Sequence, residues 1–456
     1  MSNNSITNTP GVSRAEAFLR SKDLLNNPIE VFEGYRKSMG PNFTFFFGGV
    51  KRTIITADPD FIQYILKDNN SNYLKSDIQV KRMAEFQGVG LLNSHGDYWL
   101  RQRRLLSMGF TRSNLSSILP TQIDMLAGFM DSFDKSIDEG PVDIYSQMVK
   151  FTLKSVGKTL FGDDMDDDEL EQIGEAISEI QEFILKQVFK PYLIPWYRVS
   201  GKTASFQKTR AKADKLVIDY INERKKTGSK NWDFLKLVLE TPYKDTGDLM
   251  SDEQIKIEIL QLLVAGNETS SNALTWSFYL LAKNPEHIVK IREEINEVFG
   301  DEDVDYNRLH SLEHTINVLN EVLRIYPPFW MIDRIAIKDD EFNGIKIPSG
   351  SILVPYIYGV HHNSECWESP SEFKPSRFAK ENKNNYHPFA HVPFGGGPRV
   401  CIGQNMAIMQ ILLVLVSVIK KYDFKIINNV TVEMDPRMIL RPKGDVMLDF
   451  SRIKVD

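Results

Sequence analysis

Residues 251–283 predict one long helix, and no other segment constrains the fold of this chain as strongly. Ser251 and Gln254 form a capping box at the start of the helix, apolar residues then recur at helical spacing, and Asn284-Pro285 ends it. At about 1.5 Å per residue such a helix is about 50 Å long, enough to cross a whole domain. We therefore expect a mainly helical domain built around this element.

The centre of this helix has a composition that is unfavourable for a helix. Residues 264–272 read VAGNETSSN. Gly, Asn, Thr and Ser weaken the helical hydrogen-bond ladder or compete with it. Local inconsistency of this kind is typical of a functional site.

Outside this helix, further helical patterns dominate, with a few short β-like runs at residues 43–47 with 52–55 and at residues 344–347 with 351–356. The second pair of runs predicts a hairpin around a Pro-Ser-Gly turn. The most apolar segment, residues 406–419, is shorter than the about 18 residues that cross a bilayer, so it predicts a buried core helix. The predicted fold class is mainly α with small β-sheets.

Charge and organisation narrow the classes of function. The 55 Lys+Arg against 61 Asp+Glu give a net charge of −6, so no nucleic-acid partner is expected. The first residues show no basic region followed by an apolar stretch, so we expect neither a signal peptide nor a membrane anchor. The first dozen residues are polar, so we expect a loose segment over residues 1–12. No repeat or linker divides the rest of the sequence, which predicts a single domain over residues 13–456.

The chain has two cysteines, Cys366 and Cys401. They can form neither a disulfide framework nor a structural zinc site, and their scarcity suits a reducing cytoplasm. Cys401 lies in a glycine-rich loop that reads FGGGPRVCIG over residues 394–403. The glycines permit a tight turn whose backbone N–H groups point at the sulfur, which favours a thiolate. The alternatives are a turn with a buried structural cysteine and a phosphate-binding loop, although the sequence lacks both GxxxxGK(S/T) and GxGxxG.

Five positions of this loop, Phe394, Gly397, Arg399, Cys401 and Gly403, resemble the FxxGxRxCxG haem-binding signature of the cytochrome P450 family. The resemblance implies the P450 fold, a single triangular haem domain whose long central helix passes across the haem. It also implies that Cys401 is the axial thiolate ligand of the iron of a b-type haem. Cys366 matches nothing in the family pattern, so we expect an ordinary thiol there.

Residues 321–324 resemble the family's ExxR motif, and residues 373–378 resemble its PERF segment with Ser in place of the usual Glu. The resemblance implies that Glu321, Arg324 and Arg377 form a structural cluster and have no catalytic role. The alternative for an ExxR motif is a surface ion pair that contributes about 0–1 kcal/mol.

Residues 96–104, GDYWLRQRR, resemble the WxxxR helix of the family. Buried carboxylates need charged donors, and the resemblance assigns four side chains to a haem propionate: Trp99, Arg103, Arg334 and Arg399. We interpret Arg101 and Arg104 as a solvated basic face, which can also dock an acidic electron donor.

The helix centre at residues 265–270 matches the family's AGxxT pattern, with Ser270 in place of a second Thr. The resemblance implies that Ala265 and Gly266 let the helix approach the haem. It makes Glu268 and Thr269 the acid–alcohol pair that delivers protons during oxygen activation. A Thr hydroxyl can also open the helical ladder into an oxygen-sized groove, whereas the alternative is that Thr269 only caps or kinks the helix.

Together these resemblances imply a haem-dependent monooxygenase that inserts one atom of O2 into a C–H bond of a small organic substrate. The result is hydroxylation, or oxidative O-dealkylation where the carbon bears an ether oxygen. No dinucleotide fingerprint is present, so electrons from NAD(P)H are expected to arrive through a separate ferredoxin and its reductase. We expect a cytoplasmic monomer.

The resemblance places six residues around the substrate: Phe86, Gln261, Phe329, Trp330, Met331 and Ile439. Their mixture of rings and hydrogen-bonding groups leaves open an apolar lipid or terpenoid and a polar, sugar-like substrate. Three other activities also stay open, namely a peroxide-driven peroxygenase, an isomerase or dehydratase, and a non-catalytic haem sensor or carrier. Glu268 and Thr269 disfavour the peroxygenase, because family members of that type usually lack the acid–alcohol pair.

Overall fold

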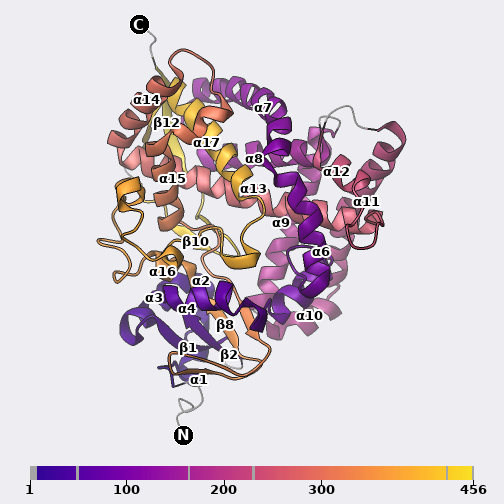
Figure 1. The fold of residues 1–456 in the computed structure, drawn as a ribbon, viewed down its shortest axis with the longest axis vertical. Helices are drawn as coiled ribbons and strands as arrows, with labels where there is room; N and C mark the ends of the chain where they lie inside the picture. Colours follow the sequence, from indigo (N-terminus) through magenta and orange to yellow (C-terminus); the bar gives the residue numbers. More distant parts are fainter. Residues whose placement is uncertain are drawn as a thin grey trace. The chain divides into compact units, whose positions relative to one another are not determined.

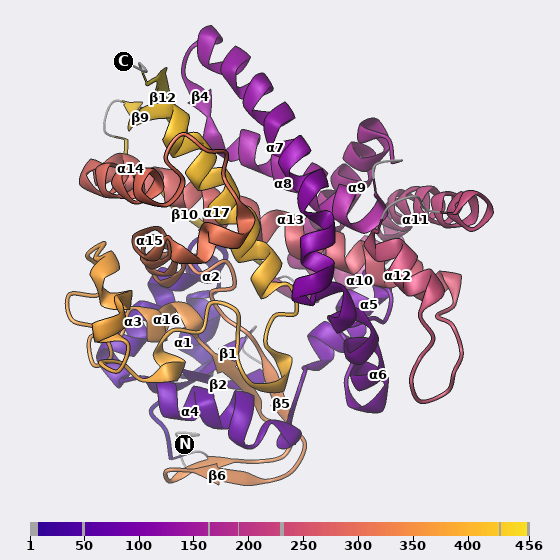
Figure 2. The same ribbon diagram turned by 45° about the horizontal axis from the view of Figure 1, so that its top comes forward.

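The computed structural model describes residues 8–47, 51–162, 165–189, 191–228, 232–427 and 430–453. They divide into two compact units, which are drawn in Figures 1 and 2. Unit 1 comprises Met1–Ser76, Glu313–Cys401 and Glu433–Lys443, and unit 2 comprises Asp77–Leu312, Ile402–Val432 and Gly444–Asp456. Helices dominate and the sheets are small, which confirms the predicted fold class.

Unit 1 contains most of the β-structure. Its helices are α1 (Arg14–Leu19), α2 (Ser21–Asn26), α3 (Pro28–Met39), α4 (Pro59–Gln63), α15 (Glu313–Ile325) and α16 (Ile357–His361). Its strands are β1 (Asn42–Phe47), β2 (Lys51–Thr56), β3 (Tyr73–Leu74), β5 (Arg334–Ala336), β6 (Asp340–Phe342), β7 (Ile345–Ile347), β8 (Ile352–Pro355), β10 (Met434–Pro436) and β11 (Leu440–Pro442). Five of these strands form one sheet in the order β1-β2-β8-β5-β3.

Aromatic side chains fill the core of unit 1 beside this sheet. The ring of Phe32 from α3 lies 5.7 Å from the rings of Phe45 and Tyr356 and 6.2 Å from that of Trp330, measured between centroids. Such tilted and edge-on contacts are favourable beyond the area they bury. The same core holds Val12, which is 2% exposed and donates its N–H to Thr44 of β1, so residues 8–12 belong to unit 1. Residues 1–7 of the predicted loose segment lie outside the described residues.

The four predicted β-like runs form strands, but the pairing of the predicted hairpin is wrong. β1 and β2 pair antiparallel, with Phe43 opposite Ile55. The strands expected within residues 344–356 exist as β7 and β8, but they do not pair with each other. β7 pairs with β6, and β8 pairs parallel with β2 and antiparallel with β5. Long-range pairing therefore overrode the local turn signal.

Unit 2 is almost entirely helical. Its helices are α5 (Ala84–Gln87), α6 (Gly96–Leu106), α7 (Arg112–Glu139), α8 (Ile144–Phe161), α9 (Asp167–Phe189), α10 (Ile194–Val199), α11 (Lys202–Thr227), α12 (Phe234–Glu240), α13 (Asp252–Lys283), α14 (Pro285–Phe299) and α17 (Gln404–Lys421). Three short strands pair in the order β4-β12-β9: β4 (Val142–Asp143), β9 (Tyr422–Ile426) and β12 (Met447–Arg452).

α13 is the predicted long helix and the central element of unit 2. It begins where the capping box predicted, because the Ser251 side chain accepts a hydrogen bond from the N–H of Gln254 at 3.3 Å. It packs along α8 and also contacts α11, α12 and α17 (Figure 1). Its side chains from Ser270 to Leu281 are all buried, which makes this half of the helix a core element.

α17 is longer than its sequence pattern predicted. Its 18 residues have a mean hydropathy of 1.3, and in the described part of the chain it is the one helix long and apolar enough to cross a membrane. Most of it is buried in unit 2 against α7, α13 and α14, as expected of a core helix.

Candidate functional site

Three charged side chains meet in the core of unit 1. Arg324 of α15 donates to both carboxylate oxygens of Glu321, and Arg377 donates to the same carboxylate at 3.2 Å. Arg324 Nη1 also donates to two backbone carbonyl oxygens, each at 2.8 Å. The side chains of Glu321 and Arg324 are 0% exposed, so the alternative of a surface ion pair does not apply. The structure brings together the three residues that the resemblance assigned to a structural cluster.

The loop that carries Cys401 depends on its glycines. Gly395 and Gly397 have φ angles of +73° and +65°, and a Cβ at Gly397 would lie 1.9 Å from the carbonyl oxygen of Leu66. The N–H of Cys401 donates to the carbonyl oxygen of Phe394 at 2.9 Å and closes the loop. Cys401 itself is exposed, so the alternative of a buried structural cysteine is wrong.

Three cations gather in unit 1: Lys75 after β3, Arg334 at the start of β5, and Arg399 in the cysteine loop. Burial, helped by the charges of Arg334 and Arg399, lowers the pKa of Lys75 to about 7. Burial also lowers the pKa of Arg334, and in both groups the carboxylate of Asp333 opposes the shift. Three cations beside one carboxylate form a site for an anion. The sequence pointed to Arg334 and Arg399 but not to Lys75, which belongs to no motif.

These residues fit the cofactor that the resemblance implies. A haem needs an axial ligand for its iron and cations for its two propionates, and unit 1 offers the exposed Cys401 and the cluster of Lys75, Arg334 and Arg399. Across the described ranges, no group of three or more His, Cys, Asp or Glu side chains could hold a metal ion. Burial raises the pKa of Cys366 to about 11, so this thiol stays protonated at neutral pH and is an ordinary one.

In unit 2, α13 stays α-helical through its unfavourable centre. Thr269 Oγ1 donates to the carbonyl oxygen of Ala265 at 2.7 Å. Ser271 Oγ and Asn272 Nδ2 both donate to the carbonyl oxygen of Glu268, at 3.1 Å and 2.6 Å. The polar side chains therefore bond back onto the helix, which explains why it tolerates them. Thr269 lies inside the helix and does not cap it, and the expected opening of the ladder is not seen at these residues.

The role expected for Gly266 needs a correction. A Cβ at this position would lie 2.9 Å from Val156 Cγ2 of α8. The missing side chain therefore allows α13 and α8 to pack closely inside unit 2, and the contact gives no support to the idea that Gly266 clears space for a cofactor. The sequence could not show this, because it does not reveal which way one residue of a helix points.

Trp99 and Arg103 lie four residues apart on α6, so they share one face of that helix. Trp99 packs against the hydrophobic core of unit 2. Arg101 on the same helix forms an ion pair with Asp245 at 2.9 Å, and Arg104 is exposed. The Arg101–Asp245 pair is partly exposed, which agrees with the interpretation of a solvated face. Arg104 is then the cation of this face that has the greater exposure.

Two of the segments expected around the substrate lie side by side in unit 1. Trp330 Nε1 donates to the carbonyl oxygen of Arg437, and the N–H of Leu440, next to Ile439, donates to that of Pro328, both at 2.8 Å. Trp330 is 1% exposed and belongs to the core, so its ring serves packing. The other three substrate residues expected in unit 1 differ in exposure: Phe329 is exposed, Met331 is half-buried and Ile439 is buried.

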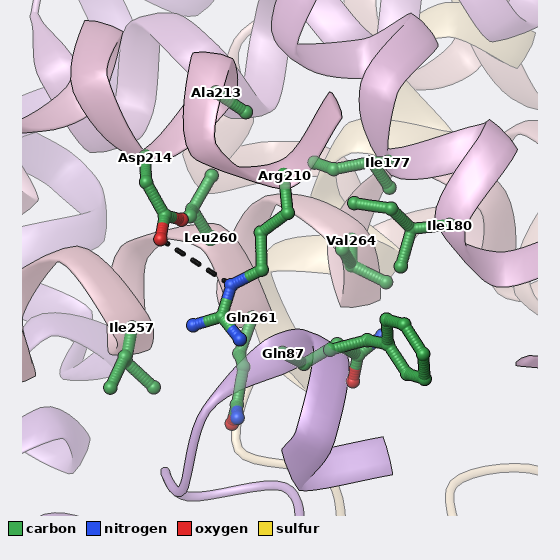
Figure 3. Close-up of a pocket in the computed structure, with 11 residues that line it drawn as sticks. Gln87, Ile177, Ile180, Arg210, Ala213, Asp214, Ile257, Leu260, Gln261 and Val264 are labelled. Atoms are coloured by element: carbon green, nitrogen blue, oxygen red, sulfur yellow. Dashed lines mark ion pairs between the residues drawn. The ribbon is translucent and has the colours of Figure 1, made fainter. Parts of the chain in front are cut away.

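The other two expected substrate residues, Phe86 and Gln261, line one pocket in unit 2 between α5, α9, α11 and α13 (Figure 3). Phe86 is 3% exposed and meets the ring of Phe183 edge-on, at 5.5 Å between centroids. The structure therefore brings together these two predicted residues from distant parts of the sequence.

The loop of residues 88–93 is anchored beside this pocket by three polar side chains of α13, Gln254, Glu258 and Gln261. Gln254 donates to a loop carbonyl oxygen at 3.1 Å, and Glu258 accepts a loop N–H at 2.9 Å. Gln261 accepts another N–H at 3.0 Å and donates to a second carbonyl oxygen at 3.2 Å. Burial raises the pKa of Glu258 to about 7. Glu258 was missed by sequence reasoning, although an acid among apolar helix positions is a usable signal.

The sequence was compared with known protein families and proteins. Residues 13–450 match the family model described as Cytochrome P450. Human cytochrome P450 4Z1 is 28% identical over 412 residues, which cover 84% of this chain and 79% of that protein. The putative cytochrome P450 132 of Mycobacterium tuberculosis is 27% identical over 428 residues, which cover 89% of each.

Solved structures give a matching result for the fold. The crystal structure of the cytochrome P450DA heme domain superposes with a TM-score of 0.87 over 98% of both chains. The sequence identity is 20%, so this likeness speaks for the fold alone.

Proposed function

This chain belongs to the cytochrome P450 family, and we propose that it inserts one oxygen atom of O2 into a C–H bond of a small organic substrate. Family membership makes it a haem-dependent monooxygenase that takes electrons from redox partners. The observation that carries the proposal is the exposed Cys401 thiol on its glycine loop, with Arg399 of that loop in the cation cluster. Hydroxylation is the direct outcome, and O-dealkylation follows where the oxidised carbon bears an ether oxygen.

Within unit 1, Cys401 would hold the haem iron, and Lys75, Arg334 and Arg399 would neutralise its carboxylates. A haem held by a cysteine thiolate supplies the activation of O2, because the thiolate pushes electron density toward the iron. We assign Trp99 and Arg103 of unit 2 the propionate contacts that the family pattern gives them.

Proton delivery is the part that this chain's own side chains perform. The Thr269 hydroxyl donates to the Ala265 carbonyl oxygen, so in this orientation it can only accept hydrogen bonds from other groups. To pass on a proton, Thr269 must exchange that carbonyl for a new acceptor. Glu268, the adjacent acid, then restores the proton on the hydroxyl and takes a replacement proton from solvent.

We propose that the electrons come from NAD(P)H through a separate ferredoxin and its reductase. The family match takes up residues 13–450, and this part of the chain shows no dinucleotide-binding fingerprint. The protein would act as a monomer in the cytoplasm, where its two cysteines stay reduced.

Isotope labelling tests the reaction. The haem-loaded protein is supplied with ferredoxin, reductase, NAD(P)H and isotopically labelled O2, and the product is analysed by mass spectrometry. We expect one labelled oxygen atom in the product, or in the released carbonyl fragment after O-dealkylation. Turnover without O2 would favour an isomerase or dehydratase, and faster turnover with peroxide alone would favour a peroxygenase.

A further inference from the structure

The pocket that Phe86 and Gln261 line in unit 2 has a mostly apolar wall with a few polar side chains (Figure 3). Apolar side chains come from all four of its helices, among them Phe86, Ile180 and Leu260. The pocket extends along α13 to Val264, the residue before the AGNETS segment. It therefore lies beside the segment that carries Glu268 and Thr269.

Two hydrogen-bond acceptors in this pocket stay unsatisfied. Gln87 Oε1 and Asp214 Oδ1 are buried, and no donor among the described residues reaches either atom. Buried polar atoms in native proteins nearly always have partners, so each such atom requires an explanation. Gln261, by contrast, uses both ends of its amide to anchor the loop of residues 88–93. The pocket thus lacks donors at Gln87 and Asp214.

Arg210 of α11 supplies a donor in the same space. Figure 3 shows its guanidinium reaching into the pocket between Asp214 and Gln87. Its Nε lies 3.3 Å from Asp214 Oδ2, and its Nη1 donates to the carbonyl oxygen of Glu85 at 3.1 Å. None of the described residues accepts a hydrogen bond from its Nη2.

The charges around the pocket compensate one another. Asp214 pairs with Arg210 and also with Lys256, at 3.0 Å, and Lys256 pairs in turn with Glu253 at 2.8 Å. Among the described side chains, these two cations and two carboxylates leave no net charge for an ionic ligand to neutralise. A ligand carboxylate would also meet Asp214, which repels it.

We propose that this pocket binds the substrate, and that the substrate is an uncharged molecule with at least one hydroxyl group on an apolar skeleton. A hydroxyl can donate, so it supplies the donor that Gln87 Oε1 lacks. An ether or a ketone only accepts, so it leaves both acceptors unpaired. The proposal rests on the monooxygenase function and names its substrate class.

The free volume of the pocket is about 30 Å³, which holds one or two waters. A larger molecule needs a side chain to move. The Arg210 side chain is 22% exposed and long, so it can swing toward solvent and admit the ligand.

Matched probes test the substrate class. Calorimetric titration of the haem-loaded protein with n-octanol, methyl octyl ether and octanoate compares a hydroxyl, an acceptor without a donor, and an anion on one skeleton. We expect octanol to bind about 10-fold more tightly than the ether, because the ether leaves a buried acceptor unpaired. Equal affinity for octanol and the ether, or tightest binding of octanoate, overturns the proposal.

Two variants and one control assign the effect to this pocket. Gln87→Leu removes one acceptor, so the preference for octanol over the ether should fall to about twofold. Gln172→Leu changes an exposed glutamine of α9 that does not line the pocket and should keep the full preference. Asp214→Asn leaves Arg210 and Lys256 in excess over carboxylates, so octanoate should bind about 10-fold more tightly than to the original protein. An unchanged preference in Gln87→Leu, or unchanged octanoate binding in Asp214→Asn, overturns the proposal.

A separate readout keeps this inference apart from the proposed function. The carbon monoxide spectrum of the same preparations reports whether a thiolate-ligated haem is present. A protein with the thiolate spectrum but no octanol preference contradicts the substrate class alone. A protein with the octanol preference but no thiolate spectrum contradicts the proposed function and leaves the ligand class standing.

Discussion

Arg324 donates two parallel hydrogen bonds to Glu321, from Nε at 2.7 Å and from Nη2 at 2.9 Å. Both side chains are fully buried. Removal of one partner from such a buried pair leaves the other charge without compensation, which is unfavourable by about 3–5 kcal/mol. We expect Glu321→Ala to lower the free energy of unfolding by this amount and to impair folding at growth temperature.

Chemical denaturation followed by circular dichroism measures this loss. Glu313→Ala is the matched control, since Glu313 lies on the same helix and pairs with Lys380 at the surface. That change should alter the free energy of unfolding by less than about 1 kcal/mol. Similar losses in both variants would show that the Glu321 cluster does not stabilise the fold.

The two cysteines should behave differently when each is replaced. The reduced protein under carbon monoxide should show the red-shifted Soret band of thiolate ligation. Cys401→Ala should abolish this band because Cys401 is the exposed thiol of the glycine loop, and Cys366→Ala should keep it because burial holds that thiol protonated. An unchanged band in Cys401→Ala would refute the assignment of the ligand.

Thr269 should matter for coupling rather than for haem binding. Thr269→Ala removes the hydroxyl proposed to deliver protons, so we expect a normal carbon monoxide spectrum but a large rise in NAD(P)H consumed per product formed. Thr275→Ala is the control, because the Thr275 hydroxyl makes the same kind of bond, to the Ser271 carbonyl oxygen at 2.7 Å. Equal uncoupling in both variants would point to a general effect on α13.

Lys75 should contribute to haem retention. Lys75→Met removes one of the three cations beside the cysteine loop, and one charged hydrogen bond is worth about 1.5–3 kcal/mol. Haem transfer to an excess of an acceptor globin should therefore become about 10–100-fold faster. Lys67→Met, at an exposed lysine of unit 1, should not change the transfer rate. Unchanged haem transfer in Lys75→Met would exclude Lys75 from the anion site.

Glu258 should make stability depend on pH. Its folded pKa of about 7 lies above the ordinary value of 4.5 for a glutamate, so the folded state binds the proton more tightly than the unfolded chain does. Its contribution to stability is therefore complete below pH 4.5 and is lost as the pH rises through 7. A pKa shift of this size changes the free energy of unfolding by about 3 kcal/mol across this pH range.

Comparison with Glu258→Gln isolates this contribution. The free energy of unfolding of the variant relative to the original protein should rise between pH 5 and pH 8, by up to about 3 kcal/mol. Glu253→Gln, on the exposed side of the same helix, gives the background. A difference that is the same at both pH values for Glu258→Gln would contradict the raised pKa.

Local sequence signals predicted the parts of this fold that depend on neighbours along the chain. The capping box at Ser251 and the Asn284-Pro285 stop located α13 within one residue of its observed start, Asp252, and at its observed end, Lys283. The loop around Cys401 was predictable for the same reason, because its glycines are needed for its own turns. Such features need no knowledge of tertiary contacts.

Features that depend on distant partners could not be predicted. β8 pairs with β2, which lies almost 300 residues earlier in the sequence, so a turn signal next to β8 carried no information about its partner. Lys75 becomes part of an anion site only because Arg334 and Arg399 fold beside it. The pocket position of Arg210 is of the same kind, since the pocket forms only where α11 meets α5, α9 and α13.

The loop of residues 88–93 is held to α13 through its backbone atoms. Gln254, Glu258 and Gln261 bond to its N–H and carbonyl groups, which every sequence except one with proline provides. The position of the loop is therefore largely independent of its exposed side chains, such as that of Val89. Exposed loop positions can accordingly diverge, or be randomised in directed evolution, while the α13 anchors keep the loop beside the pocket.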